Sequence, residues 1–406
     1  MVPISSIDPE PPLKVIKATT QTPKPMAWTE RSGRDDVLLQ QRKEFLRPDS
    51  LLAIVMLTDE NDCSIKDSGP AWLMAGSKDN IKVAAQICET NPNDPCCYSC
   101  NMDPPEGCAK DPTCETRAYD DKSNLRCFDQ KRRFGYDFLF PTARYVNALK
   151  LKTICPYQNF GDLDCECTGH DKSCTPGPSF PNPLYTADAE QLAAGITPRT
   201  EANMIFLAGI VGVPWQDIAT SESLNRGKEY LKYLPASEIR WDYLLPDANG
   251  NPPVDPLMRE SMTARSGIHP VTQEPIGGPT GTNRLNQING HEWDPDNDLQ
   301  FACTFDLTQL AATKDCAKEA SNTCSCSTTS APAGSMSPLC QNPTDGSYGT
   351  TQYAAKAYPG TRQLEVLRAY NDTVKNNSIV ASICPRTSTQ INRIRPVMVT
   401  TRQSRR

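Results

Sequence analysis

The stretch that decides the fold is FLRPDSLLAIVMLTDENDCS, residues 45–64. It contains seven consecutive apolar residues, from Leu51 to Leu57. Because this run does not alternate with polar residues, it predicts a buried strand of a parallel sheet. Acidic and amide residues follow at 59–62. A strand with such an ending places oxygen atoms at the carboxyl edge of the sheet, where open α/β sheets bind ligands.

Two further apolar runs, at 204–213 and 379–383, predict two more strands of the same kind. Apolar residues at helical spacing predict helices over 35–46, 141–150 and 361–375. Each predicted helix either precedes a predicted buried strand in the sequence or lies in a connection between two such strands. This pattern is typical of layered α/β proteins. We therefore expect a partial, doubly wound, Rossmann-like parallel sheet.

The predicted strands are unusually far apart in the chain. About 145 residues separate the first from the second and about 165 separate the second from the third, whereas a crossover connection needs a few dozen. The intervening stretches, 63–130, 155–200 and 221–360, hold most of the proline, glycine, asparagine and cysteine. We expect them to be long, irregular, cysteine-rich insertions that project from one sheet.

The remaining stretches define the expected core and the two ends. The core is expected to consist of residues 29–62, 131–154, 201–220 and 361–395. Residues 1–28 are expected to be a disordered or remnant segment, and residues 396–406 a solvated basic tail. The net charge is −6 and the basic residues are scattered, which argues against a nucleic-acid partner. No apolar run approaches the roughly 18 residues that a membrane span needs, so we expect none.

The chain contains 18 cysteines, an even number, clustered among proline, asparagine, aspartate and glycine. This pattern favours loops held by disulfides over structural zinc or free thiols. Cys97 and Cys100 form the one C-x-x-C pair, and of three histidines only His170 lies in a cysteine cluster. Cys63 and Cys384 are each expected to pair with a cysteine of an insertion. The disulfide candidates are Cys63, Cys96, Cys97, Cys100, Cys127 and Cys384.

Disulfides form outside the cytoplasm, so we expect an extracytoplasmic protein, either secreted, periplasmic or on the cell surface. The first residues, MVPISSID, show no basic region followed by an apolar one, so the chain carries no signal peptide. Together these observations predict that the true N-terminus is missing.

Five short segments follow one another in a recognisable order. They are the quoted stretch at 45–64, Arg126-Cys127-Phe128, residues 141–149 (PTARYVNAL), residues 208–213 (AGIVGV) and Ser382-Ile-Cys384. In these segments the chain resembles the C-terminal half of the von Willebrand factor A-like proteins that myxobacteria and their relatives export.

The resemblance implies a metal site at the carboxyl ends of the central strands, the metal-ion-dependent adhesion site. In that family an Asp-x-Ser-x-Ser loop, a threonine and an aspartate from a third loop supply the ligands. Thr58 and Asp59 match the third loop, and Glu60 and Asp62 are further candidates. Oxygen ligands of this kind suit Mg²⁺ or Ca²⁺.

The chain departs from the family in its first half. It has no Asp-x-Ser-x-Ser, and about 50 residues precede the strand that the family would place fourth. Residues 8–20 look like the remnant of a family helix. We therefore expect an incomplete metal site and an exposed apolar edge at 51–57. The explanations left open are a misassigned start, a fragmented gene, or a partner chain that supplies the missing strands.

Other candidate sites favour ordinary structure. Residues 247–251 and 294–298 alternate oxygen-bearing side chains as calcium loops do, but neither has the glutamate at position twelve, so we expect turns. His291-Glu292 lacks a second histidine four residues later, so we expect a surface loop rather than a zinc-protease helix.

These observations predict a non-enzymatic protein that binds or supports other structures outside the cytoplasm. Its expected ligand is a protein or the extracellular matrix. Two alternatives remain open: a decayed or truncated fragment without independent function, and a metal-dependent enzyme built on the cysteine-rich insertions. The enzyme would need a nucleophile paired with a base or a full set of zinc ligands, and no sequence pattern supplies either.

Overall fold

The computed structural model describes residues 15–17, 29–31, 36–66, 73–74, 81–117, 121–154, 180–225, 231–247, 250–271, 273, 275–276, 292–293, 295, 297–318, 324–326 and 337–384. The chain forms two compact units, which are described separately. The first comprises residues 1–54 and 140–206, and the second comprises residues 55–139 and 207–406. The tail at 396–406, His170, His291 and four cysteines (Cys155, Cys165, Cys167 and Cys174) lie outside the described residues.

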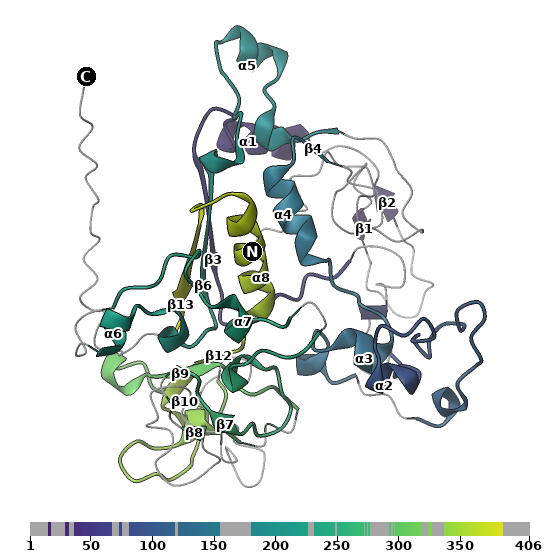
Figure 1. Ribbon diagram of the computed structural model, residues 1–406, viewed down its shortest axis with the longest axis vertical. Coiled ribbons are helices and arrows are strands. Elements are labelled where there is room, and N and C mark those ends of the chain that lie inside the picture. The colour runs from purple at the N-terminus through teal and green to yellow at the C-terminus, as the bar shows by residue number, and fades with distance from the viewer. Residues whose placement is uncertain are drawn as a thin grey trace. The chain divides into compact units, whose positions relative to one another are not determined.

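A three-stranded parallel sheet forms from the three predicted apolar runs, as β3 (Leu52–Leu57), β6 (Ile205–Val211) and β13 (Ser378–Ser382). The strand order is β13-β6-β3, with β6 in the centre (Figure 1). Ser378 is in register with Leu207, and Ser382 with Val211. The prediction of a mixed α/β protein with a parallel sheet is therefore confirmed.

One face of this sheet is buried and the other is exposed. In the second unit Leu207, Val211 and Val380 are buried, whereas Val55 and Ile379 are each 60% exposed. The expectation of buried strands is therefore wrong for one of the two faces. Strand side chains alternate between the two faces, so the residues that point away from the buried face are the exposed ones. The expected apolar edge at 51–57 is confirmed, since β3 is the last strand of the sheet and Leu57 is 68% exposed.

Helix α8 (Thr361–Thr373) covers the buried face and contacts β13 (Figure 1). Glycines permit this close approach. A Cβ at Gly209 would lie 2.4 Å from the Leu367 side chain, and one at Gly212 would lie 1.8 Å from the Tyr358 carbonyl oxygen. Larger residues at these two positions would push α8 and the segment before it away from the sheet.

The first unit holds two predicted helices. The helix expected over 35–46 is α1 (Asp36–Phe45), and the one over 141–150 is α4 (Thr142–Lys150). Arg199 is buried and donates to the carbonyl oxygens of Ser50 (2.6 Å) and Leu184 (2.8 Å). The other elements are β1 (Val15–Lys17) paired with β2 (Thr29–Arg31), β4 (Thr153–Ile154) paired with β5 (Phe180–Pro181), α5 (Ala189–Ala193), and the short 3-10 helices η5 (Pro183–Tyr185) and η6 (Ala202–Met204). Residues 15–17 are thus extended rather than part of a remnant helix.

The stretch 63–130 of the second unit is mostly irregular, as expected. Its elements are α2 (Ile87–Thr90), η3 (Pro112–Glu115) and η4 (Ser123–Leu125), and α3 (Gln130–Phe134) follows directly. A small buried cluster surrounds Cys88, Cys97 and Tyr98. Disulfides therefore supply part of the core that such a short stretch cannot build from apolar side chains.

The stretch 221–360 contains more regular structure than a wholly irregular insertion would. Its elements are α6 (Ser221–Asn225), α7 (Trp241–Leu244), η8 (Pro256–Met258), β7 (Gly267–Ile268), β8 (Pro275–Ile276), β9 (Cys303–Asp306), η10 (Thr308–Leu310), β10 (Lys314–Asp315), η11 (Pro338–Cys340), β11 (Thr351–Gln352) and β12 (Ala354–Ala357). The antiparallel pairs are β7 with β8, β9 with β12, and β10 with β11.

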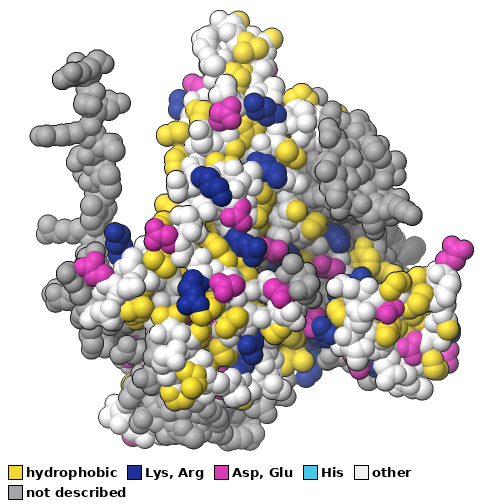
Figure 2. All heavy atoms as spheres, viewed as in Figure 1, with side chains coloured by type: hydrophobic (Ala, Val, Ile, Leu, Met, Phe, Trp, Pro, Cys, Tyr) yellow, Lys and Arg dark blue, Asp and Glu magenta, His cyan; other side chains and the backbone are white. Residues whose placement is uncertain are grey.

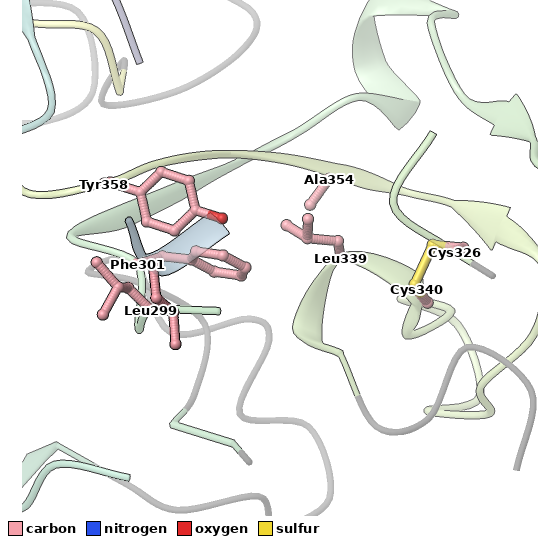
Figure 3. Close-up of a cluster of buried hydrophobic side chains, with 8 residues drawn as sticks. Leu299, Phe301, Cys326, Leu339, Cys340, Ala354 and Tyr358 are labelled. Atoms are coloured by element: carbon pink, nitrogen blue, oxygen red, sulfur yellow. A yellow bond between two sulfur atoms is a disulfide. The ribbon is translucent and has the colours of Figure 1, made fainter. Parts of the chain in front are cut away.

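Most residues of one buried hydrophobic cluster come from this stretch, and Leu125 of the stretch 63–130 joins them. Figure 3 shows Leu299, Phe301 and Tyr358 on one side of the cluster and the Cys326–Cys340 disulfide on the other. The Phe301 and Tyr358 rings meet edge to face at 5.5 Å. Long-range burial of this kind does not follow from sequence periodicity, which explains why the local pattern predicted loops alone.

All six predicted disulfide cysteines lie in disulfides, and every other cysteine among the described residues does too. Cys63 pairs with Cys127, and Cys384 pairs with Cys303, so both join insertion cysteines as expected. The remaining described pairs are Cys88–Cys97, Cys96–Cys108, Cys100–Cys114, Cys316–Cys324 and Cys326–Cys340. This disulfide content indicates an oxidising location. Within the described part of the chain, no helix has the length and apolar character to cross a membrane.

Candidate functional site

The acidic loop that follows β3, residues 58–62, lies at the carboxyl end of the sheet as predicted. The Thr58 backbone N–H donates to the Ile210 carbonyl oxygen (3.2 Å), which extends the pairing with β6. The Thr58 hydroxyl accepts from the Glu60 N–H (3.1 Å) and closes a tight turn. Asp59 is exposed, and its carbonyl oxygen accepts from the Tyr358 N–H (2.8 Å).

The second half of the acidic loop holds the first turn of α8. The Asn61 side-chain oxygen accepts from the Arg362 backbone N–H (3.1 Å), and its amide donates to the Thr361 hydroxyl (3.0 Å). Asp62 forms an ion pair with the Arg362 side chain (3.1 Å). Asn61 thus satisfies a helix N–H that would otherwise have no partner within the helix, a role usually taken by the capping residue.

The side chains of the four predicted ligands are therefore in different environments. Asp59 and Glu60 are exposed, Thr58 is bonded within the turn, and Asp62 already neutralises an arginine. The assignment of a Mg²⁺ or Ca²⁺ site to these residues stays a prediction. What the geometry does show is that the loop fastens α8 to the end of β3.

The structure describes some residues of the other candidate patterns. Both carboxylate oxygens of Asp247 bond to Asn251 (2.9 and 2.7 Å), which fits the predicted turn. Asp298 accepts from the Tyr358 hydroxyl (2.6 Å), whereas Asp294 and Asp296 lie outside the described residues. The surface-loop expectation is wrong for Glu292. Its carboxylate is fully buried and receives two bonds of 2.9 Å from the Arg265 guanidinium.

A buried Asp-Asp-His group lies in the second unit, and sequence reasoning did not single it out. Asp217 belongs to the short 3-10 helix η7 (Trp215–Ile218), shortly after β6 ends. Asp255 precedes η8, and His269 directly follows β7. The side chains of the three residues are 0–1% exposed. The fold thus brings one residue from the end of the sheet together with two from the insertion 221–360.

The ligand atoms of this group lie within 4.8 Å of one another. His269 Nε2 is 3.2 Å from Asp217 Oδ1 and 3.9 Å from Asp255 Oδ2. Asp255 Oδ1 is already used, because it accepts from the Leu257 N–H (2.9 Å) at the start of η8. The spacing and the chemistry of the group are those of a site that could hold a metal ion.

Burial dominates the electrostatics of the group. It raises the pKa of Asp217 to about 6. Burial, a hydrogen bond with the Asp217 side chain and the charge of Asp217 together raise the pKa of Asp255 to about 8. Burial lowers the pKa of His269, against the attraction of Asp255. Two buried carboxyl groups in contact cannot both be ionised without a cation between them, so this group holds either a proton or a metal ion.

Some signals for this group are present in the sequence. Asp217 follows the end of the second apolar run, and His269 is one of three histidines in the chain. Asp255 precedes Pro256, a pattern typical of a helix start. None of these signals says that the three side chains meet, because Asp217 and His269 are joined by a long, proline-rich stretch without periodicity.

One face of the sheet exposes the apolar side chains of Val55, Leu57 and Ile379. Ile379 is in register with Ala208, and the Thr58 bond to Ile210 places Leu57 beside Ile210. On the side of the molecule viewed in Figure 2, basic and acidic side chains are interspersed rather than gathered by sign.

Comparison with family models, with curated proteins and with solved structures finds no match for this chain.

Proposed function

We propose that this chain is a non-enzymatic protein of the cell exterior that binds another protein through a von Willebrand factor A-like α/β core. The observation that carries the proposal is the exposure of Val55, Leu57 and Ile379 on one face of the parallel sheet. Parallel sheets are normally covered on both faces, because their crossover connections place helices there. The partner supplies the missing cover and the strand beside β3.

The apolar character of this surface supports a protein partner rather than a small molecule. Val55, Leu57 and Ile379 expose 60%, 68% and 60% of their area, and they project from two different strands of one sheet. A contiguous apolar surface of this kind marks a site of protein contact. At the edge of the sheet β3 has hydrogen-bonding groups that can pair with an added strand.

The disulfides support a location outside the cytoplasm. Seven described pairs hold the insertions, and two of them, Cys63–Cys127 and Cys303–Cys384, join an insertion to the end of a sheet strand. Loops held in this way are displayed in fixed positions at little entropic cost on binding. The buried group at Asp217 favours a non-enzymatic function, since its side chains are closed to a substrate.

Site-specific photo-cross-linking tests the proposal. A photoreactive residue is placed in the full chain at Leu57, at Ile379 or, as a control, at the exposed Lys110 of the insertion 63–130. The chain is then exposed to extracytoplasmic proteins of its source. We expect one and the same protein to be cross-linked at Leu57 and Ile379 but not at Lys110. Absence of an adduct, identical adducts at all three positions, or cross-linking to a second copy of this chain would refute the proposal.

Mass spectrometry of the non-reduced protein from its source tests the location. We expect the fourteen described cysteines to be paired as found here. Free thiols at Cys63 and Cys384 would place the protein in a reducing compartment and contradict the proposed location.

A further inference from the structure

We propose that Asp217, Asp255 and His269 bind one divalent transition-metal ion, such as Zn²⁺, in a closed structural site. This site is separate from the acidic loop after β3. It is also independent of the proposed binding function, since no residue of the apolar sheet face takes part.

The unused oxygen atoms of the group point to a cation. Asp217 is buried, and no described N–H donates to either of its carboxylate oxygens; the Asp255 carboxyl group can donate to Asp217 only while it holds a proton. The 3.2 Å contact of Oδ1 with His269 Nε2 is close, but it is not aligned as a hydrogen bond. Asp255 Oδ2 likewise receives none. A buried carboxylate oxygen with neither a hydrogen-bond donor nor a cation beside it destabilises the folded state. A metal ion between these oxygens removes that penalty.

The ligand set selects the class of ion. Two carboxylate oxygens and one imidazole nitrogen suit Zn²⁺ and its neighbours, whereas Mg²⁺ and Ca²⁺ prefer oxygen alone. The observed separations of 3.2 and 3.9 Å from Nε2 to the two oxygens bracket the ~3.4 Å expected between ligands of a tetrahedral zinc ion. Since the three side chains are 0–1% exposed, the site is of the structural rather than the catalytic kind.

The contacts around the group fit this assignment and predict a local change. Leu257 orients Asp255 by donating its N–H to Oδ1, so that Oδ2 faces the histidine. The Val271 N–H lies 3.3 Å from His269 Nδ1 and donates to it, so in the metal-free protein the neutral imidazole carries its proton on Nε2. A metal ion at Nε2 moves that proton to Nδ1 and opens the long contact with Val271.

The ion would fasten the insertion 221–360 to the end of the central strand. Asp217 follows β6, whereas Asp255 precedes η8 and His269 follows β7 in the insertion. The Cys303–Cys384 disulfide ties the same insertion to the end of β13. Two independent links of this kind hold the insertion at the carboxyl edge of the sheet.

The test uses the full chain, freed of metal with a chelator at pH 7.5 and then titrated with Zn²⁺ alone. We expect one Zn²⁺ per chain by elemental analysis after dialysis, and a rise in the melting temperature. Asp217→Asn and His269→Gln are each expected to weaken Zn²⁺ binding by about 100-fold or more, since each removes a ligand. Asp345→Asn, at an exposed carboxylate elsewhere in the insertion 221–360, serves as the matched control and keeps full binding.

Nitrogen-15 NMR of the histidine imidazoles provides a readout that does not depend on stability. Zn²⁺ should move the His269 proton from Nε2 to Nδ1. Three results would overturn the proposal: no retained Zn²⁺, a melting temperature indifferent to Zn²⁺, or equal Zn²⁺ binding in Asp217→Asn. The last would indicate an adventitious surface ion, and the first two would show that the group holds a proton instead.

Discussion

The acidic loop at 58–62 and the buried Asp-Asp-His group both lie beyond the carboxyl ends of parallel strands, yet they use their oxygen atoms in opposite ways. In the loop, Asn61 and Asp62 bond to the first turn of α8. In the buried group, Asp217 receives no hydrogen bond from a described N–H, and Asp255 can donate to it only while protonated. A dense run of acidic residues is therefore a weaker sign of an ion site than a few buried oxygens that have no donor.

The difference follows from solvent access. Asp59 is exposed, so water solvates it and the fold need not provide a partner. Asp217, Asp255 and Glu292 are buried, so each needs a proton, an arginine or a metal ion. Glu292 forms an ion pair with Arg265. Breaking this pair is the strongest test of the difference between buried and exposed carboxylates.

Arg265→Ala is expected to have the largest effect, because it leaves the Glu292 carboxylate buried without its partner. We expect the free energy of unfolding to fall by about 3–5 kcal/mol, measured by denaturant titration. The matched change in the acidic loop, Arg362→Ala, breaks a pair that retains some solvent contact and should cost about 1 kcal/mol or less. Equal losses in the two variants would contradict the contrast between the regions.

The second largest effect is expected in the pH dependence of stability, which distinguishes the buried Asp-Asp-His group from the acidic loop. In the metal-free protein the pKa of Asp255 is about 8, above its unfolded value near 3.8, so the folded state holds a proton that the unfolded state has lost. Stability therefore falls as pH rises towards 8, by about 2 kcal/mol between pH 6.5 and 8.5. Asp217 loses its proton at lower pH, near 6, and Arg240 attracts its carboxylate.

The interval above pH 6.5 isolates this effect from His269. Because burial lowers the pKa of His269, its own contribution to stability is lost as pH falls below 6.5, where the unfolded histidine gains a proton. Thermal unfolding in a chelator at pH 6.5 and 8.5 measures the slope. Asp255→Asn should reduce the slope, and the slope that remains comes from Glu60 and Glu260, whose pKa values desolvation raises to about 7. Asp345→Asn, at an exposed carboxylate, should leave the slope unchanged. A flat profile for the unmodified chain would show that Asp255 ionises freely.

Asn61→Ala tests the structural role of the acidic loop. It removes the side chain that accepts from the Arg362 N–H, so we expect a loss of about 1 kcal/mol, as for other capping residues. Asn61→Asp keeps the accepting oxygen, but it replaces the amide that donates to the Glu260 carboxylate (3.2 Å) with a second carboxylate, so it should not recover the stability. If both variants matched the unmodified chain in denaturant titration, the loop would not be what fastens α8.

Asp59→Asn should have the smallest effect on stability, within about 0.5 kcal/mol, since the side chain is exposed. The same variant tests the predicted Mg²⁺ or Ca²⁺ site. If Asp59 is a ligand, calorimetric titration with either ion gives heat for the unmodified chain and none for the variant. If the two titrations are identical, the loop does not bind Mg²⁺ or Ca²⁺ through Asp59, in contrast to the site proposed at Asp217.

Sequence patterns located much of the regular structure. The apolar runs at 51–57, 204–213 and 379–383 became β3, β6 and β13, and helical spacing over 361–375 became α8. Consecutive apolar residues and helical periodicity are local properties, so they can be read without knowing what lies nearby. The same runs gave a wrong expectation about burial, because whether a second layer covers the sheet is not a local property.

The pairing of cysteines was predictable in part. Their number and surroundings indicated disulfides, and the positions of Cys63 and Cys384 at strand ends indicated partners in the insertions. The particular partners, Cys127 and Cys303, depend on how each insertion folds back. Many pairings are compatible with one sequence, and the chain path selects among them.

The sequence by itself determined the class of the protein: a parallel α/β sheet with cysteine-rich insertions stabilised by disulfides. Only the tertiary structure decided which oxygen atoms lack a donor, because Asp217, Asp255 and His269 come from separate segments and meet through chain reversals that leave no periodic signal. Hydrophobic patterning is a local property of the sequence, whereas the burial and the partners of a polar atom depend on every segment that surrounds it.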